Sequence, residues 1–238
     1  AVLLGLRTGG EALQPADDVV VAVHLHGQGL GGGLHELLNF RGELPAVFNQ
    51  QVLDLLLLLG QLVKSEFFHL GFEEENVEYQ KYYPVKIERS WRQKTDDANM
   101  LFDVCRKKGV RPWIWVDPQS IQGFGGVQRF RENVGKDVLL SNWWYEDIFY
   151  AGDEERSGTK LYREIDEWGY EQVPTCSTWT NFHNPKQTMK YCKQYLKDEL
   201  VLGYMTAPWL TTRKEFFNGL LGDSHIFGQA KKSVYKSK

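Results

Sequence analysis

The residues of this chain best suited to acid–base chemistry are three consecutive glutamates that follow a short apolar run. The run, Phe67 to Leu70, has the composition of a buried strand, and Gly71 permits a tight exit from it. Carboxyl groups at the end of such a strand, here Glu73, Glu74 and Glu75, can face a cleft and act as proton donors. Composition alone favours another interpretation, a solvated helix start, because acidic residues suit the positive end of the helix dipole.

The sequence from His69 to Glu74, taken as a whole, favours a catalytic role for these glutamates. It resembles the His-x-Gly-Gly-Asp-Glu motif of the family 20 glycoside hydrolases, the β-N-acetylhexosaminidases. In that family the motif closes the fourth strand of a (β/α)8 barrel, the final Glu is the general acid, and the preceding Asp orients the acetamido group of the substrate. The resemblance implies that Glu74 is the acid and Glu73 the orienting carboxylate, with His69 supporting both. Phe72 stands where the family has Gly, and Glu73 where it has Asp, so the acid is better supported than its partner.

Adjacent carboxylates suit one form of glycoside hydrolysis. Most glycosidases place two carboxyl groups on opposite sides of the scissile bond, which neighbouring residues of a strand cannot do. In the family 20 mechanism the substrate's own acetamido oxygen attacks the anomeric carbon, and the protein supplies an acid and an orienting group. We therefore expect Glu74 to protonate the glycosidic oxygen and Glu73 to stabilise the positive charge of the oxazolinium intermediate.

Alternating strands and helices must position these residues. Thr95 or Asp96 can cap the first helix, and Pro185 suits the first turn of a later one. Such alternation indicates parallel strands covered by helices. The expected strands lie near 67–70, 111–117, 137–145, 171–179 and 200–209, and the expected helices near 95–108, 160–168, 184–196 and 214–221.

The five strands match the fourth to eighth strands of a (β/α)8 barrel. The expected fold class is therefore α/β, a TIM-barrel-like fold that is incomplete, with the resemblance covering about residues 65–225. The glycines of the segment 123–135 lack phosphate-loop spacing, so this segment is expected to be a loop. A basic tail is expected after the last helix.

The exits of these strands are rich in aromatic residues, in a chain that has eight Trp, 11 Tyr and 13 Phe. Barrel sites are assembled from the carboxyl ends of strands, and aromatic faces pack against the C–H faces of sugars. Tyr145 is expected to donate to the acetamido oxygen, whereas Asp117 serves equally well as a turn residue before Pro118. The family's last strand commonly ends in Trp-x-Glu, but Thr211 stands in the place of that Glu. The residues expected to bind substrate are His69, Trp115, Asp117, Trp143, Trp144, Tyr145, Trp179 and Trp209.

Composition excludes several other classes of function. The net charge of -3, with both signs interspersed, gives no footprint for nucleic acid or for an anionic membrane. The apolar run 52–63 is too short and too polar to span a bilayer. Three cysteines without metal-ligand spacing are expected to be buried thiols, and His24, His26 and His35 are not accompanied by clustered acids. We expect no metal and no cofactor. Oligomeric state and compartment cannot be read from the sequence.

The first 62 residues differ in kind from the rest. They contain no Lys, Trp or Tyr, although they are rich in Gly and Leu. The compositional break divides the chain into an atypical segment, 1–62, and the remaining barrel part, 63–238. About 65 residues are too few for the first half of a barrel, so the segment is either a remnant of that half or unrelated to the fold. The chain also begins with Ala1, from which we expect that the true N-terminus is missing or was processed.

The sequence thus predicts a glycoside hydrolase that acts on oligosaccharides or glycoconjugates containing N-acetylhexosamine. Two alternatives stay open. A non-catalytic carbohydrate-binding barrel, or an inactive fragment, is suggested by the replaced Asp and the short first half. The second alternative is a glycosidase with two separated carboxylates, for instance Glu74 with Asp117 or Glu146. Inversion of configuration at the released sugar would favour it.

Overall fold

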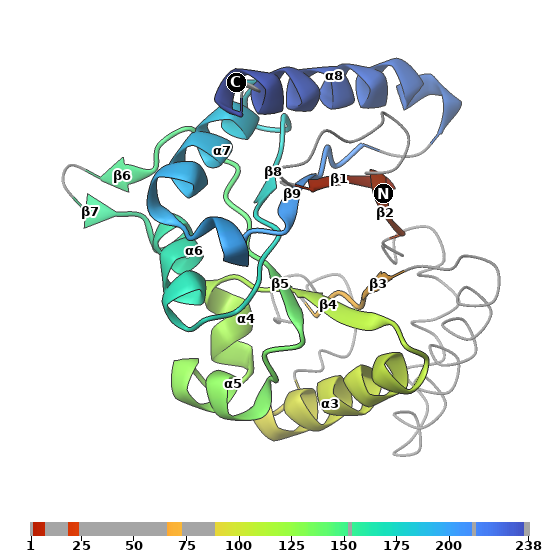
Figure 1. The fold of residues 1–238 in the computed structure, drawn as a ribbon, viewed down its shortest axis with the longest axis vertical. Coiled ribbons are helices and arrows are strands. Elements are labelled where there is room, and N and C mark those ends of the chain that lie inside the picture. The colour runs from red at the N-terminus through yellow and green to blue at the C-terminus, as the bar shows by residue number, and fades with distance from the viewer. Residues whose placement is uncertain are drawn as a thin grey trace, which may run out of the picture.

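The computed structural model describes residues 2–7, 19–23, 66–72, 89–151, 154–210 and 213–235. Its central feature is a row of parallel strands (Figure 1). β3 (Phe67–His69), β4 (Arg111–Trp115) and β5 (Leu139–Ser141) pair in parallel, and so do β8 (Thr175–Cys176) and β9 (Gly203–Thr206). Parallel bridges from Leu140 to Gln172 and from Trp143 to Thr175 join the two groups. The five predicted strands are therefore confirmed, in chain order.

Two further strands extend the row beyond β9. β1 (Val2–Arg7) pairs antiparallel with β9 and with β2 (Val19–Val23), so that the order of this sheet is β2-β1-β9-β8. Within the described ranges no strand pairing joins β2 to β3, and the barrel is not closed there. The division of the chain at residue 62 stays a prediction.

Helices follow the strands in the predicted alternation. α3 (Trp91–Lys107) follows β3, α6 (Ser157–Glu167) follows β5, α7 (Asn184–Tyr195) follows β8, and α8 (Phe217–Val234) follows β9. The short elements are β6 (Tyr150–Ala151), β7 (Glu154–Glu155), η1 (Asp198–Leu200) and η2 (Lys214–Phe216). Figure 1 shows α6 and α7 on the side of the strands away from β1 and β3.

The first helix begins earlier than predicted, and the predicted cap is wrong. Ser90, not Thr95 or Asp96, is the N-cap, because Ser90 and Gln93 form a reciprocal capping box: the Gln93 N–H donates to the Ser90 Oγ and the Ser90 N–H to the Gln93 Oε1. Thr95 lies buried within the helix.

The segment 123–135, predicted to be a loop, is partly helical. α4 (Pro118–Gly123) and α5 (Val127–Asn133) are joined by Gly125 and Gly126, which both have positive φ. These helices form because Asp117 caps α4 and because Phe130 is fully buried against the strands. The predicted basic tail is likewise helical: α8 runs to Val234, with Phe227 and Ala230 buried on one face.

The side chains of the strands divide into two faces. On the outer face, the α3-side core gathers Ile114, Val116 and Leu140 with residues of α3 to α6, and the α7-side core gathers Cys176 and Tyr204 with residues of α6, α7 and α8. On the inner face lies a third cluster, the inner aromatic cluster, whose members are Trp113, Trp115, Leu139, Tyr145, Val173, Met205 and Ala207, bordered by Phe67, Trp143, Leu202 and Trp209. The alternation of inward and outward residues is what the pleat of a strand requires.

Candidate functional site

The predicted acids Glu73 and Glu74 lie outside the described residues, but the turn that leads to them is described. Gly71 and Phe72 have φ of 87° and 71°, so the chain leaves β3 through two successive left-handed residues. Phe72 occupies this conformation, which favours glycine, and it stands where the family motif has glycine. Its ring is 9% exposed and packs 6.4 Å from Phe102 and 6.3 Å from Phe124 between ring centres. The α3-side core therefore holds Phe72 in place.

His69 lies at the carboxyl end of β3, on the inner face. Its ring is 5% exposed and lies 4.9 Å from the Trp113 ring and 4.7 Å from the Trp115 ring, measured between ring centres. The Gly71 N–H donates to the imidazole Nδ1 at 3.2 Å, so the neutral ring carries its proton on Nε2. His69 and Trp115, which the sequence predicted for the site, are thus brought together.

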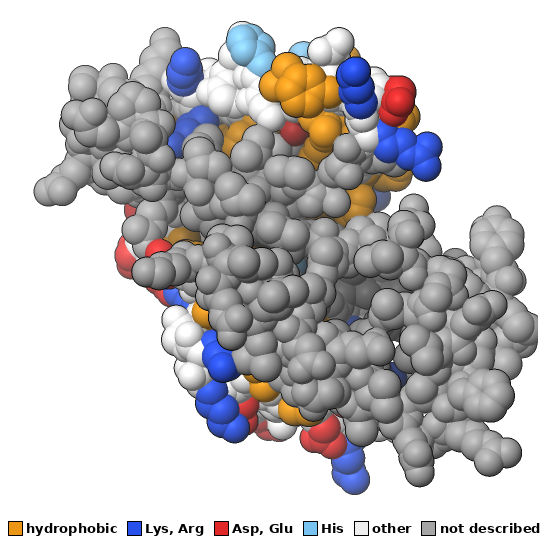
Figure 2. All heavy atoms as spheres, turned by 90° about the vertical axis from the view of Figure 1, so that its right-hand side faces the viewer, with side chains coloured by type: hydrophobic (Ala, Val, Ile, Leu, Met, Phe, Trp, Pro, Cys, Tyr) orange, Lys and Arg blue, Asp and Glu red, His pale blue; other side chains and the backbone are white. Residues whose placement is uncertain are grey.

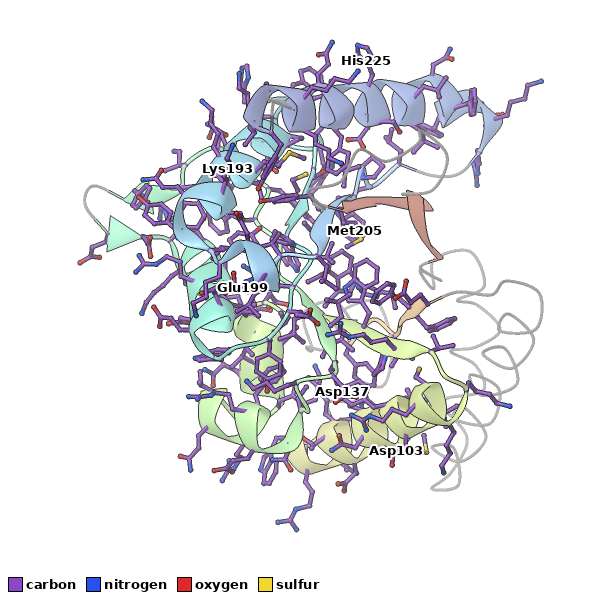
Figure 3. The ribbon with its side chains drawn as sticks, viewed as in Figure 1. Asp103, Asp137, Lys193, Glu199, Met205 and His225 are labelled. Atoms are coloured by element: carbon purple, nitrogen blue, oxygen red, sulfur yellow. The ribbon has the colours of Figure 1, made fainter. Side chains whose placement is uncertain are left out.

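Three more of the predicted residues form a continuous aromatic series. The Trp143 and Tyr145 rings stack at 5.0 Å with an interplanar angle of 24°, and the Tyr145 ring meets the Trp209 ring edge-on at 6.2 Å. These residues follow β5 and β9, and they border or belong to the inner aromatic cluster together with Trp115. Figure 3 shows Met205, another member, on the side of β9 opposite α7. The carboxyl ends of three strands therefore share one set of aromatic rings, the aromatic surface, in which Trp115 and Tyr145 are buried.

Two polar features are buried among these rings, a chain of hydrogen bonds and an unpartnered indole N–H. The Trp113 Nε1 donates to the Ser141 Oγ at 2.7 Å, and that hydroxyl donates to the Val173 carbonyl at 2.8 Å. This chain of hydrogen bonds crosses from β4 through β5 to the segment that leads to β8, and it fixes the floor of the cluster. The indole Nε1 of Trp143 is buried and has no hydrogen-bond partner among the described residues. An unpartnered donor at this depth suits a polar ligand.

The backbone at Trp209 is strained. This residue has φ of 52°, the left-handed region that costs a non-glycine residue about 1–2 kcal/mol. Strain of this kind persists where the surrounding structure determines the conformation, often at ligand sites. The strain places the indole ring against Tyr145.

Three predicted residues lie apart from the aromatic surface. The Trp144 indole belongs to the α7-side core, donates to the Ile148 carbonyl at 3.1 Å and packs against Gly158. Trp179 is 65% exposed on the loop after β8. Asp117 caps α4: its carboxylate accepts from the backbone N–H of Gln119 and Ser120 at 2.8 and 3.1 Å, and from the Ser120 hydroxyl at 2.5 Å. Asp117 thus acts as the turn and cap residue that the sequence allowed.

Asn184, which sequence reasoning missed as a site element, clamps two of the loops. Its side chain is fully buried. Its Nδ2 donates to the carbonyls of Trp144 and Glu146 at 2.8 and 2.9 Å, and its Oδ1 accepts from the Ser177 N–H at 2.9 Å. Both sides of Tyr145 are therefore fixed to the loop after β8. The sequence signal, Asn before Pro at a helix start, indicated only the helix.

Asp223 is a buried ionisable group beside β9. On the outer face the Asp223 carboxylate accepts from the hydroxyls of Thr178 and Thr206 at 2.6 and 2.9 Å. Burial raises the pKa of Asp223 above its ordinary value, although these hydrogen bonds oppose the shift. The three cysteines are free and buried, as predicted, and burial raises the pKa of Cys105 to about 11.

Among the described residues, no cluster of three or more His, Cys, Asp or Glu side chains could hold a metal ion. No helix in those ranges is long and apolar enough to cross a membrane.

Searches with protein-family models and among curated proteins give no match for this chain. Solved structures do match. Dispersin B is similar with a TM-score of 0.46 and 12% identity, over 83% of this chain and 60% of Dispersin B. The pneumococcal exo-β-D-N-acetylglucosaminidase StrH, which has tandem GH20 catalytic modules, matches with a TM-score of 0.42 and 17% identity, over 77% of this chain and 47% of the StrH chain. A β-N-acetylhexosaminidase from Bacteroides fragilis matches with a TM-score of 0.40 and 11% identity, over 79% of this chain and 47% of that enzyme.

The chain therefore spans between about half and three fifths of the length of the solved chains that it matches. Its structure is similar, at low sequence identity, to those of GH20 β-N-acetylhexosaminidases over about four fifths of its own length.

Proposed function

We propose that residues 63–238 are the carboxyl-terminal part of a glycoside hydrolase barrel that acts on N-acetylhexosamine-containing glycans. One observation carries the proposal: Trp143, Tyr145 and Trp209 form a continuous aromatic surface at the carboxyl ends of two parallel strands. In an α/β barrel this end holds the site, and aromatic faces bind the C–H faces of a sugar. His69, the first residue of the motif, lies at the same edge of the sheet, beside Trp113 and Trp115.

In the proposed mechanism each group has one role. Glu74 protonates the glycosidic oxygen as the leaving group departs. The acetamido oxygen of the substrate attacks the anomeric carbon, and Glu73 accepts the acetamido N–H and stabilises the positive charge of the oxazolinium. The Tyr145 hydroxyl donates to the acetamido oxygen. The indoles of Trp143 and Trp209 pack on the sugar ring and exclude water.

The decisive experiment is Glu74→Gln with an aryl N-acetyl-β-glucosaminide. The amide is isosteric but cannot donate an acidic proton, so the rate is expected to fall by about 10²–10⁴-fold, the usual contribution of a general acid. Glu75→Gln is the matched control, because it removes a neighbouring charge with no assigned role, and we expect it to retain most of the rate. A loss of less than about tenfold for Glu74→Gln would remove Glu74 as the acid.

Participation of the acetamido group is tested separately. The wild-type protein is expected to cleave the N-acetyl substrate and to leave the corresponding plain glucoside largely uncleaved, because only the former carries the internal nucleophile. Equal turnover of both substrates would rule out this mechanism.

A non-catalytic sugar-binding barrel is the second candidate. It is favoured because binding needs no acid, and the aromatic surface is the part of the site that the described residues supply. Binding of N-acetylglucosamine oligosaccharides by the wild-type protein without hydrolysis, and weaker binding by Trp209→Ala, would support it. A glycosidase that pairs Glu74 with Asp117 is disfavoured, because the Asp117 carboxylate is occupied by three hydrogen bonds within α4 and its cap.

A further inference from the structure

A pocket lies on the outer side of the molecule, at the hairpin that connects β5 to α6. Its volume is about 540 Å³, within the range of small-molecule sites. The hairpin β6–β7, α6 and α7 supply its lining residues, which are Tyr150, Glu154, Glu155, Lys160, Arg163 and Tyr195. Figure 1 shows this hairpin beside α6 and α7, on the side away from β1 and β3. Nothing in the mechanism proposed above uses these residues.

Two tyrosine rings at this pocket are both accessible and fixed. Tyr150 and Tyr195 are 37% and 40% exposed, and their hydroxyl groups are hydrogen-bonded to each other at 3.1 Å. Both rings also contact the buried Tyr191, with ring centres 6.4 and 4.8 Å apart. The rings therefore lose little conformational freedom when a ligand packs against them, which favours binding.

Three of the four charged residues of the pocket form ion pairs, and the four charges balance. The Glu155 carboxylate pairs with Arg163 at 2.9 Å and accepts from the Tyr191 hydroxyl at 2.9 Å, and Lys160 pairs with Glu164 at 3.1 Å. The Arg163 guanidinium lies 5.5 Å from the centre of the Tyr195 ring. Two acids face two bases, so the pocket has no excess charge that would select an anion or a cation.

The Tyr150 hydroxyl adds no charge to the pocket near neutral pH. Burial and the hydrogen bond with Tyr195 raise the pKa of Tyr150 to about 12, so its hydroxyl stays neutral. A ligand that suits such a pocket is neutral, has apolar faces for the tyrosine rings, and carries hydroxyl groups for the guanidinium, the ammonium and the carboxylates.

We infer that this pocket is a second binding site for a neutral oligosaccharide, separate from the aromatic surface at the strand ends. The outer site holds one or two sugar units against Tyr150 and Tyr195, with Arg163 and Lys160 donating to hydroxyl oxygens. A site of this kind raises the residence time of a glycan chain on the protein, because two contacts on one chain act together. The inference does not depend on catalysis at Glu74.

The test is calorimetric titration with two neutral ligands, a linear N-acetylglucosamine pentasaccharide and a linear glucose pentasaccharide. It uses the Trp209→Ala protein, so that the strand-end surface contributes little. We expect this protein to bind at least one of the two sugars, and the further change Tyr195→Ala to weaken that binding about tenfold or more. Tyr150→Ala serves in its place if the first variant is unfolded by circular dichroism. Phe217→Ala, which truncates a 58% exposed ring on α8, is the matched control and is expected to leave the affinity unchanged.

Three results would overturn the inference. They are the absence of binding of both sugars by Trp209→Ala, an affinity that neither tyrosine variant alters, and tighter binding of a sulfated disaccharide than of the neutral sugars. If Glu74→Gln loses hydrolysis but binds sugar at the outer site with unchanged affinity, the result supports the proposed function and leaves the outer site standing. Conversely, hydrolysis by a wild-type protein that has no outer binding would refute the outer site alone.

Discussion

The two faces of the parallel strands are built from different kinds of side chain. The outer face is covered by helices through aliphatic and phenyl groups such as Ile114, Leu140 and Phe130. The inner face gathers the indoles of Trp113 and Trp115 with Tyr145, and it buries polar atoms such as the Ser141 hydroxyl and the Trp143 Nε1. Helix packing needs only apolar volume, whereas a ligand surface needs flat rings and a few placed polar atoms. The outer face therefore serves helix packing, whereas the inner face has the composition that a ligand surface needs.

Among the substitutions considered, Phe102→Ala, on the outer face, should lower the unfolding free energy most. Phe102 is fully buried in the α3-side core, and removing such a ring costs about 3–5 kcal/mol of unfolding free energy. Urea denaturation should show the loss as a lower midpoint with an unchanged slope. The fraction that stays folded should bind sugar normally at the strand ends. A variant of normal stability would contradict the assignment of this core.

Asn184→Ala tests the connection between the two loops that flank the aromatic surface. The change leaves the Ser177 N–H and the carbonyls of Trp144 and Glu146 without their partner. The bond to Ser177 is buried, and a buried group that loses its partner costs about 1–3 kcal/mol. We expect a loss of at least about 2 kcal/mol in urea denaturation.

A merely structural role for Asn184 predicts that loss alone. If the clamp also positions Tyr145, the folded protein should show a weaker aromatic signal in near-ultraviolet circular dichroism and a reduced sugar affinity. Asn184→Asp is the comparison, because it keeps the acceptor for Ser177 and removes both donated bonds. Unchanged spectra and affinity in both variants would refute positioning.

The order of strands and helices was predictable because it depends on local pattern. The strand at Arg111–Trp115 and the helix at Asn184–Tyr195 are marked by apolar runs and by Pro185, which the sequence displays directly. The failures have physical reasons. Ser90 and Gln93 form the cap through a reciprocal pair of bonds that a search for single capping residues overlooks. The helix α5 depends on the burial of Phe130, which is a tertiary effect.

The sequence predicted which residues lie at the carboxyl ends of the strands, but not how their side chains are oriented. Position along the chain brought His69, Trp115, Trp143, Tyr145 and Trp209 together, because parallel strands end at one edge. It could not tell which face each ring takes. Trp143 and Trp144 are neighbours in sequence, yet the pleat sends the first to the inner cluster and the second to the α7-side core. Glu73 and Glu74 stay predictions.

A pair of substitutions at Trp209 separates recognition from backbone strain. Trp209→Ala and Trp209→Gly both remove the ring and should both weaken sugar binding at the strand ends. Only glycine adopts the φ of 52° at no cost, so Trp209→Gly should be more stable than Trp209→Ala by about 1 kcal/mol. The comparison uses urea midpoints of the two variants. Equal midpoints would indicate that this conformation is not held once the ring is gone.

The smallest expected effect concerns the outer face and its dependence on pH. Burial raises the folded-state pKa of Asp223, so the folded protein binds the proton of this group more tightly than the unfolded chain. The contribution of Asp223 to stability is therefore complete below its unfolded pKa, near 3.8, and is lost as the pH rises through its folded-state pKa.

Asp223→Asn should remove this loss, because an uncharged amide can still hydrogen-bond to Thr178 and Thr206. Measured by urea denaturation at a series of pH values, the unfolding free energy of the variant relative to wild type should increase as the pH rises above 3.8 and then become constant. Affinity for sugar at the strand ends should not change, since both threonine contacts lie on the helix-covered face. A difference between the two proteins that is independent of pH would show that the hydroxyl groups fully compensate the buried charge.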